Sequence, residues 1–443
     1  MDYTPHTDQD ISEMLEVIGI SKIDDLFEPI PKTLRLGRAL DIPPALAESE
    51  VVDLMSSFAS RNLGADSLIC FAGGGAYDHY VPAAVRSVAY RAEFLTSYTP
   101  YQPELSQGVL GTLFEYQTMI SELTGMDVAN ASLYDGASSL VEAVNLAAGA
   151  TSRSKIVLTA ALNPNYRSVL ETFGKALGYE FITAGSDQAR TDLSSIDLSD
   201  VACVVVAQPN FFGVIEDIKQ AADVAHAAGA LLVVHFDPLS AGLLEAPGAL
   251  GADVVTGEGQ CLGNELNFGG PYLGIFATKM EHVRRVPGRI CGATVDVHGK
   301  PGFVLTLQAR EQHIRREKAN SNVCTNQTLM AVVATVYLSW LGPQGLAELA
   351  TTCTSRAHRA AELLSSVPGC SLAFDQPFFK EFVLTVPGNA DEIVWKMAER
   401  GFLLGPSLAM FEGMQDKLIV AVTERRHPDD IELLAKTLAE VVA

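Results

Sequence analysis

The stretch GADVVTGEGQCLGNELNFGGPYLG, from Gly251 to Gly274, reads as two short buried strands joined by a polar turn. Apolar residues gather at Asp253–Thr256 and again at Tyr272–Ala277, and short runs of this kind are typical of strands buried on both faces. The stretch has no lysine before Lys279, which begins a charged segment after the second run. We therefore expect Lys279 to face solvent.

This strand–turn–strand pattern has a chemical meaning in α/β enzymes that use pyridoxal phosphate (PLP). There the turn carries the lysine that forms a Schiff base with the cofactor. No lysine is available in the turn here. The pattern therefore predicts a cofactor-type site that lacks its covalent anchor, and no metal site is predicted.

Outward from this stretch, the chain alternates between strand and helix signals from Asp127 onward. Strands are predicted at Lys155–Ala160, Tyr179–Thr183, Val201–Ala207 and Leu231–Phe236. A βαβ series of this kind predicts an α/β fold, with a mostly parallel sheet and helices on both faces.

The two ends of the chain differ from this central pattern. Residues 1–65 show helix signals without strands, so we expect a helical arm that lies on the body or on a partner. Residues 66–342 are predicted to form the large domain, in which Val286–Gly302 is a Gly/Pro-rich excursion. Residues 343–443 are predicted to form a small α+β domain.

Composition excludes several classes of function. The net charge of −22 argues against binding nucleic acid or an anionic membrane through bulk charge. No apolar run approaches the ~18 residues of a membrane span. The seven cysteines form no CxxC pair, and the acidic, polar N-terminus does not resemble a signal peptide. We therefore expect a cytoplasmic location.

Two loops carry possible anion-binding chemistry. FAGGGAYDHYVP, residues 71–82, has three glycines whose N–H groups either cradle an anion or serve a tight turn. SLYDGASS, residues 132–139, precedes a helix, so Ser138 and Ser139 either bind a phosphate or belong to a helix cap.

Two further positions stay open between a functional and a structural role. Asp237 ends a central strand after His235. In PLP enzymes of this topology an aspartate there pairs with the pyridinium nitrogen, but an acidic residue at a strand end often has no special role. Cys324 follows a charged run, and we favour a reduced structural cysteine over a nucleophile.

Several segments together resemble the P-protein family of the glycine cleavage system, glycine dehydrogenase (decarboxylating), in its subunit 1 form. They cover most of the chain: FAGGGAYDHYVP at 71–82, FLTSYTPYQPELSQG at 94–108, FEYQTMISELTGMDVANASLYDGAS at 114–138, GEGQCLGNELNFGGPYLG at 257–274 and REKANSNVCTNQ at 316–327.

The resemblance implies a fold-type-I PLP architecture and a heterodimer with subunit 2. It implies that the partner holds PLP, decarboxylates glycine and passes the aminomethyl group to the lipoyl arm of H-protein. Gln260 stands near the position of the lysine, and an amide forms no imine. Ser138, Ser139 and Asp237 are then vestigial cofactor positions.

Because fold-type-I active sites lie at subunit interfaces, we expect this chain to supply one wall of the partner's site. The loop stiffened by Pro100 and Pro103 is the candidate, with substrate-binding residues Tyr98, Tyr101, Gln102 and Glu104. Two alternatives remain: a scaffold that stabilises subunit 2 without touching substrate, and an independent PLP-dependent transferase that uses another lysine.

Overall fold

The computed structural model describes residues 5–443, and the first four residues of the predicted arm lie outside the described part. Contacts divide the chain into two compact units, Met1–Asn62 and Leu63–Ala443.

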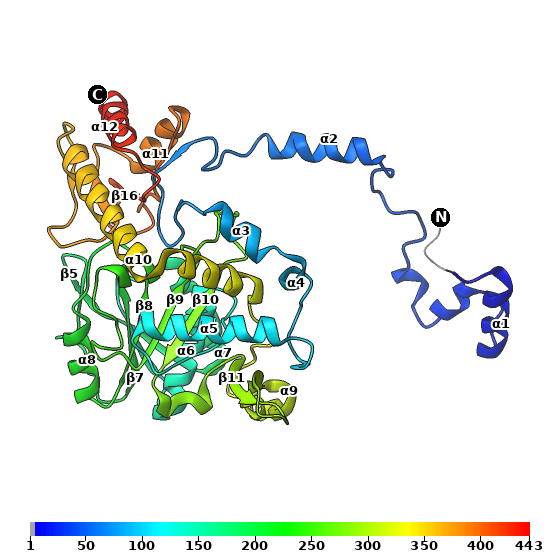
Figure 1. The fold of residues 1–443 in the computed structure, drawn as a ribbon. Helices are drawn as coiled ribbons and strands as arrows, with labels where there is room; N and C mark the ends of the chain where they lie inside the picture. The colour runs from blue at the N-terminus through cyan, green and yellow to red at the C-terminus, as the bar shows by residue number, and fades with distance from the viewer. Residues whose placement is uncertain (1–4) are drawn as a thin grey trace. The chain divides into compact units, whose positions relative to one another are not determined.

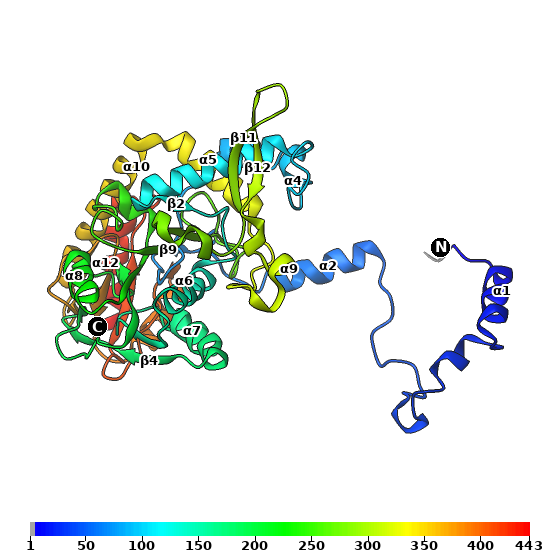
Figure 2. The same ribbon diagram turned by 90° about the horizontal axis from the view of Figure 1, so that it is seen from below.

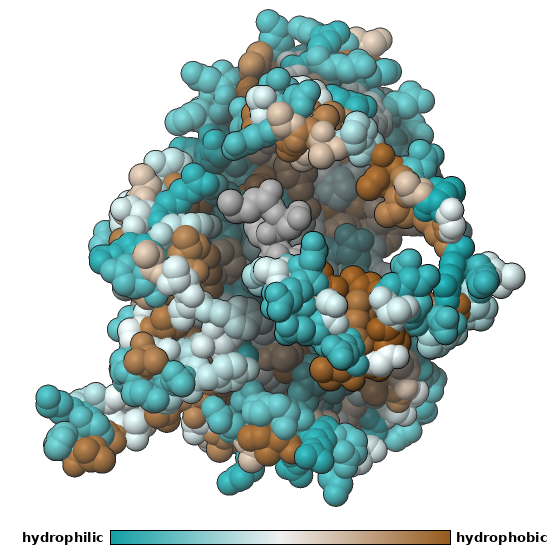
Figure 3. Space-filling model, turned by 90° about the vertical axis from the view of Figure 1, so that its right-hand side faces the viewer, coloured by the Kyte–Doolittle hydropathy of each residue, from teal (hydrophilic) through white to brown (hydrophobic). Residues whose placement is uncertain are grey.

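Within residues 5–62, the first unit contains two helices and two 3₁₀ turns. Helix α1 (Asp8–Ile18) begins at a capping box in which Thr7 and Asp10 bond each other's backbone N–H groups, and α2 is Glu48–Ala59. No residue from 5 to 62 is buried. Large apolar side chains are exposed along its length. Among the most exposed are Val17, Leu34, Leu40 and Ile42. On the face of the molecule in Figure 3, hydrophobic patches lie among hydrophilic ones.

The second unit is built on a seven-stranded sheet of order β2-β10-β9-β8-β7-β3-β4. The strands are β2 (Val128–Ala129), β3 (Lys155–Leu158), β4 (Glu180–Thr183), β7 (Val201–Gln208), β8 (Leu231–Phe236), β9 (Val254–Glu258) and β10 (Gly274–Thr278). All neighbours from β4 to β9 pair in parallel, and β10 runs antiparallel to β9 and β2. The predicted sheet and the strand–turn–strand are therefore confirmed.

Helices cover both faces of this sheet because the strand residues alternate in direction. Val204 and Val206 of β7 belong to a core shared with α5 (Gln107–Thr124), α8 (Ile218–Ala227) and α10 (Thr328–Ser365). Val205 belongs to a second core with α6 (Gly136–Thr151) and α7 (Pro164–Leu177). The two layers are visible on opposite sides of the strands in Figure 1 and Figure 2.

The C-terminal part has its own antiparallel sheet and core. Its strands are β13 (Ser371–Leu372), β14 (Glu381–Thr385) and β16 (Lys417–Ala421), which pack with α11 (Ala390–Glu399), α12 (Pro428–Val442) and the second half of α10. Phe71 enters the same core after β1 (Ile69–Cys70), which pairs with β15 (Phe402–Leu403). Helix α10 is interrupted at Gly342, where the backbone has φ 63°. The domain boundaries at 65 and 342 stay predictions.

Shorter elements complete the unit. They are α3 (Ala83–Ala89), α4 (Ala92–Leu95), β5 (Gly185–Asp187), β6 (Arg190–Asp192), β11 (Ile290–Val295), β12 (Pro301–Thr306) and α9 (Gln312–Arg315). Strands β11 and β12 form an antiparallel ribbon, so the Gly/Pro-rich segment from 286 to 302 is more ordered than the excursion that we expected.

Two expectations need correction. Lys279 is only about one-third exposed, and its ammonium pairs with the buried carboxylate of Asp253 rather than facing solvent freely. Helix α10 is long and apolar enough to pass a length-and-composition test for a membrane span, which the sequence had not led us to expect. Half of that apolar window is buried inside the second unit, as is typical of a core helix.

Candidate functional site

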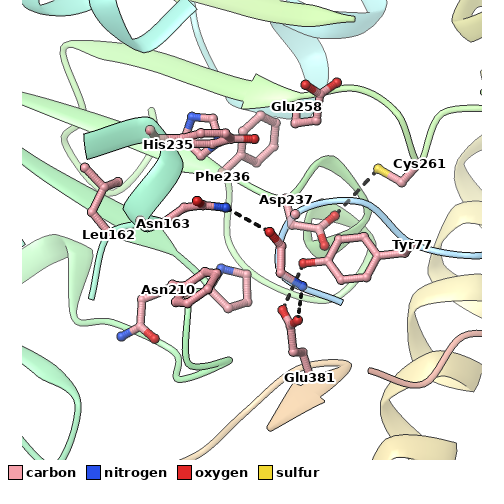
Figure 4. A pocket seen from close by; sticks show the side chains of 16 residues that line it. Tyr77, Leu162, Asn163, Asn210, His235, Phe236, Asp237, Glu258, Cys261 and Glu381 are labelled. Carbon is pink, nitrogen blue, oxygen red and sulfur yellow. Dashed lines mark hydrogen bonds between the residues drawn. The ribbon is translucent and has the colours of Figure 1, made fainter. Parts of the chain in front are cut away.

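The carboxyl ends of the parallel strands surround a cavity of about 60 Å³. Ligands of α/β sheets bind at this edge. Figure 4 shows the side chains that converge there from the main sheet, the 71–82 loop and β14. The residues that line the cavity include Gly74, Tyr77, Asn163, Tyr166, His235, Asp237, Glu258, Cys261 and Glu381, and none of the lining residues is a lysine.

Glu258, at the end of β9, fills the anion position of the cavity. Its carboxylate accepts N–H bonds from Gly136 at 2.9 Å, Leu273 at 3.0 Å and Gln260 at 3.1 Å. Gly136 is the first residue of α6, where free N–H groups and the helix dipole favour a negative group. Burial raises the pKa of Glu258 to about 7, although the N–H bonds act against that rise.

Ser138 and Ser139, the two predicted phosphate-binding residues, lie at the start of α6, but neither side chain is presented to the cavity as a hydrogen-bond donor. The backbone N–H of Ser138 donates to the Asp135 side chain at 2.7 Å, which caps α6. Ser139 is fully buried, and its hydroxyl has no hydrogen-bond partner among residues 5–443. Of the two interpretations of this loop, the geometry favours the cap.

Asp237 is engaged by a lysine that is distant in sequence. Its Oδ2 lies 2.7 Å from Nζ of Lys380, and its Oδ1 accepts the N–H of Leu239 at 3.0 Å. Lys380 is 1% exposed, and its ammonium lies 3.8 Å from the centre of the Tyr77 ring. Burial is the largest single influence and lowers the pKa of Lys380, but the contacts with Asp237 and the nearby thiols together outweigh it and raise the pKa.

The ion pair continues into a buried polar chain. Nζ of Lys380 lies 3.1 Å from Nε2 of His79, and Nδ1 of His79 lies 2.7 Å from Glu424. Burial lowers the pKa of His79, and the adjacent ammonium acts in the same direction. A neutral imidazole that accepts from Lys380 and donates to Glu424 satisfies all three groups.

His79, Cys353 and Glu424 also bring three possible metal-ligating atoms within 4.8 Å of one another. The sequence had led us to predict no metal site. The Lys380 ammonium at 3.1 Å from His79 disfavours a second cation at this place. The cluster is therefore described here as part of the polar chain.

Gln260, near the predicted lysine position, has a structural role in the 71–82 loop. The side chain is 1% exposed. Its Oε1 accepts the N–H of Tyr77 at 2.9 Å, and its Nε2 donates to the carbonyls of Tyr77 at 3.0 Å and Asn264 at 2.7 Å. The Gly74 N–H donates to Glu381 at 2.6 Å. These contacts favour the tight-turn interpretation of the glycines.

The four predicted substrate-binding residues lie on an exposed loop, not in this cavity. Tyr98 is 82% exposed and Tyr101 55%, and Gln102 and Glu104 are exposed as well. Within residues 5–443, Tyr101 is the only one of the four whose side chain makes a hydrogen bond, which it accepts from Arg289 at 3.0 Å. The structure thus separates the loop residues from Ser138, Ser139, Asp237 and Gln260.

The sequence analysis missed the charged residues that support the cavity and the Tyr101 loop. Lys380 and Glu381 lie on or beside a strand of the C-terminal sheet, and no local pattern marks them as neighbours of Asp237. Arg289 is 2% exposed and follows Pro287 and Gly288 in a segment that we took for an irregular excursion. A single arginine next to a proline–glycine pair is too weak a signal to identify.

Cys324 is exposed and Cys261 is buried, and all seven cysteines are free thiols. The thiol of Cys261 lies 3.7 Å from Asp237, and burial raises its pKa. A raised thiol pKa disfavours a nucleophilic role for Cys261.

The raised pKa of Glu258 predicts a pH-dependent stability. Between about pH 4.3 for the unfolded chain and about pH 7 for the folded one, the folded state binds the proton more tightly. This stabilisation is present below that window and is lost as pH rises through it. Glu258→Gln has no titrating group there. The free energy of unfolding of the variant relative to wild type should therefore increase with pH, by at most about 1.4 kcal/mol per unit.

Urea unfolding at several pH values measures this difference, in which the other titrating groups cancel. Glu399→Gln, at an exposed glutamate of α11, controls for the substitution itself. A difference between Glu258→Gln and wild type that does not change with pH would show that Glu258 stays ionised in the folded chain.

The chain is similar in sequence to known proteins over its whole length. Residues 1–438 match the family described as the glycine cleavage system P-protein. A probable glycine dehydrogenase (decarboxylating) subunit 1 from Desulforamulus reducens is 48% identical over 100% of both chains. The protein of the same description from Chlorobium limicola is 48% identical over 99% of this chain and 100% of its own.

Solved structures agree. A glycine decarboxylase (P-protein) of the glycine cleavage system, in inhibitor-bound form, matches with TM-score 0.90 and 45% identity over 100% of both chains. The sphingosine-1-phosphate lyase of Burkholderia pseudomallei matches with TM-score 0.65 at 16% identity over 93% of this chain and 94% of its own, a likeness of fold alone. The predicted fold-type-I architecture is confirmed, and the chain belongs to the glycine cleavage system P-protein family.

Proposed function

We propose that this chain is subunit 1 of a glycine decarboxylase of the glycine cleavage system, active only together with a PLP-carrying subunit 2. The full-length similarity to proteins described as subunit 1 supports the pairing. The observation that carries the division of labour is the cavity at the strand ends, which the chain fills with its own charged side chains.

PLP does not fit this cavity. An open cofactor site typically measures roughly 300 Å³ or more, whereas the cavity measures about 60 Å³. The N–H group at the start of α6 that would bind a phosphate is bonded to Glu258. Asp237, the expected partner of the pyridinium nitrogen, is neutralised by Lys380. Gln260 has no amine to offer. The proposal therefore places PLP on the partner subunit.

The role of this chain is then to complete the partner's site and to hold it in shape. The exposed loop with Tyr98, Tyr101, Gln102 and Glu104 is proposed to bind glycine, or the lipoyl arm of H-protein, across the interface. The seven free cysteines suit a reducing compartment, and the proposal includes a cytoplasmic location. The alternative, a scaffold that makes no substrate contact, is an outcome of the experiments below.

The first unit is proposed to bind subunit 2. Its exposed apolar side chains are spread over α1, α2 and the segment between them, with none buried from residue 5 to 62. Apolar groups spread over several turns of helix are what a partner surface covers.

The pairing is tested by glycine–bicarbonate exchange in the presence of lipoylated H-protein. We expect no exchange from either subunit alone and rapid exchange from the mixture. Sedimentation of the same samples checks assembly. Exchange by this chain alone would favour the independent transferase, and full exchange by subunit 2 alone would remove this chain from the reaction.

The cofactor assignment predicts the result of borohydride reduction in the presence of PLP. This chain alone should give no specifically labelled lysine on peptide mapping, because Lys380 is buried behind the Tyr77 ring and paired with Asp237. In the mixture the label should appear on subunit 2. A stoichiometric label on any peptide of this chain, above all that of Lys380, would contradict the assignment.

The arm predicts a loss of affinity on truncation. Deleting residues 1–62 should weaken the complex with subunit 2 by at least about tenfold, while the melting temperature of the remaining unit changes little. Leu34→Asp with Leu40→Asp, at side chains 76% and 66% exposed, should act in the same direction without truncation. Trp395→Asp, at a side chain 74% exposed on α11, is the matched control. An unchanged dissociation constant would assign the arm to another role.

A further inference from the structure

Arg289 is a buried cation without an anionic partner. It is 2% exposed, and no carboxylate of residues 5–443 lies within 4.0 Å of its guanidinium. Its acceptors are neutral: the Asn326 side chain at 2.9 Å, the Cys324 carbonyl and the Tyr101 hydroxyl at 3.0 Å each, and the Thr325 hydroxyl at 3.4 Å. Its Nε is buried and has no partner among the described residues. A buried charge left without a counter-charge is costly, so its retention calls for an explanation.

The contact with Tyr101 fixes the direction of one hydrogen bond. A guanidinium only donates, so the Tyr101 oxygen is the acceptor of the 3.0 Å bond. The hydroxyl proton of Tyr101 is therefore directed to some other acceptor, and no acceptor for it is observed within residues 5–443. The ring is 55% exposed, and the guanidinium carbon lies 5.2 Å from its centre. Tyr101 thus has a hydroxyl donor without a partner within residues 5–443, beside the positive charge of Arg289.

The loop that carries Tyr101 is held to the element that carries Arg289. Nε2 of Gln107 donates to the Pro103 carbonyl at 2.7 Å and to the Phe303 carbonyl at 2.8 Å. Its Oε1 accepts the Phe303 N–H at 2.9 Å. Phe303 lies on β12, whose partner strand β11 begins directly after Arg289. Because the loop is held in this way, its side chains have little freedom left to lose when a ligand binds.

Three of the segments that carry the family resemblance meet at this point. Tyr101 belongs to the proline-stiffened loop, and Cys324 and Asn326 belong to the segment from 316 to 327. Tyr134 belongs to the segment from 114 to 138, and its hydroxyl accepts the N–H groups of Cys324 at 3.1 Å and Thr325 at 3.3 Å. Three distant parts of the chain therefore meet around the contact between Arg289 and the Tyr101 hydroxyl.

We propose that Arg289 and Tyr101 form one recognition unit for an anionic oxygen, in which Tyr101 donates the hydrogen bond and Arg289 is its positioning residue. The proposal rests on the proposed function. The ligand is a carboxylate or a phosphate presented across the subunit interface: either the carboxylate of glycine or the phosphate of the cofactor on the partner subunit. A neutral ligand has no need of the unpaired charge of Arg289.

The test is a double-mutant cycle in the assembled pair with H-protein. Tyr101→Phe removes one hydroxyl, and Arg289→Lys keeps the charge but loses the planar fork of donors. Each should lower kcat/KM for glycine by roughly 5- to 150-fold, with assembly unchanged. Both substitutions disturb the same hydrogen bond. The kcat/KM of the double variant should therefore be only slightly lower than that of the less active single variant.

Two measurements distinguish the sources of the anion. If the ligand is glycine, KM rises and the preference of the site for glycine over glycinamide, which lacks the carboxylate, falls, while the dissociation constant for PLP stays constant. If the ligand is the phosphate, the PLP dissociation constant rises and the preference between glycine and glycinamide stays constant. A change in either measurement supports anion recognition by the Tyr101 hydroxyl.

Controls separate this role from general packing. Tyr90→Phe removes a half-exposed hydroxyl that makes no hydrogen bond within residues 5–443. Arg310→Lys alters a guanidinium whose hydrogen bonds within residues 5–443 all go to the backbone carbonyls of Val286, Gly288 and Leu307. Neither should move KM or the PLP dissociation constant.

Three outcomes would overturn the proposal. Unchanged kinetics of Tyr101→Phe in an intact, active pair would remove the donor. Additive losses in the double variant, or an Arg289→Lys chain that does not assemble, would assign Arg289 to folding instead of positioning. A wild-type pair without exchange activity would be a failure of the proposed function, and it is seen before any variant is measured.

Discussion

The ion pair between Asp237 and Lys380 ties the two sheets of the body together. Asp237 follows a central strand of the parallel sheet, and Lys380 directly precedes β14 of the C-terminal sheet, with 2.7 Å between the charged atoms. Both charges lie away from water, so each depends on the other. Removing one partner of a buried pair typically costs about 3–5 kcal/mol, because the charge that remains is left uncompensated. The extension through His79 to Glu424 and the aromatic ring of Tyr77 satisfy the other sides of the ammonium.

With this pair in place, the cavity at the edge of the sheet is small and lined by charged side chains that already have partners. A PLP-type fold makes two charged contacts with its cofactor. A helix N-terminus binds the anionic phosphate, and an acidic side chain pairs with the ring nitrogen. Here Glu258 supplies the anion and Lys380 supplies the cation, both from the chain itself. The Gln260 side chain uses both of its donors and its acceptor oxygen on Tyr77 of the neighbouring loop and on Asn264 of its own turn. The fold is kept while its central cavity is filled by internal ligands.

The chemistry that remains available lies on the loop around Tyr101. The Tyr101 side chain is about half exposed, yet its position is set by a buried arginine and by segments from three parts of the chain. An exposed group with this much support differs from an ordinary surface residue, since surface side chains are usually held by few contacts. This contrast between a small cavity whose charges are already paired and a well-supported loop favours a site shared with a partner subunit.

The sequence by itself determined the architecture. Apolar strands alternate with amphipathic helices from Asp127 onward, and the buried run at Val201–Gln208 is apolar on both faces. Periodicity of this kind is a local property, so it is readable without coordinates. The absence of a lysine in the 251–274 stretch and the combination of family segments were readable for the same reason. The loop from 98 to 104 was also identified from its prolines and tyrosines.

Only the tertiary structure decided which charges meet. His79 and Lys380 are 301 positions apart, and Gly136 and Glu258 are 122 apart. No local pattern encodes such contacts, because they arise when separate segments are brought to one edge of a sheet by burial of their apolar neighbours. Arg289 was overlooked for the same reason: its meaning depends on its burial and on the lack of a nearby carboxylate. Both are properties of the folded surroundings and not of the residues beside it in the chain.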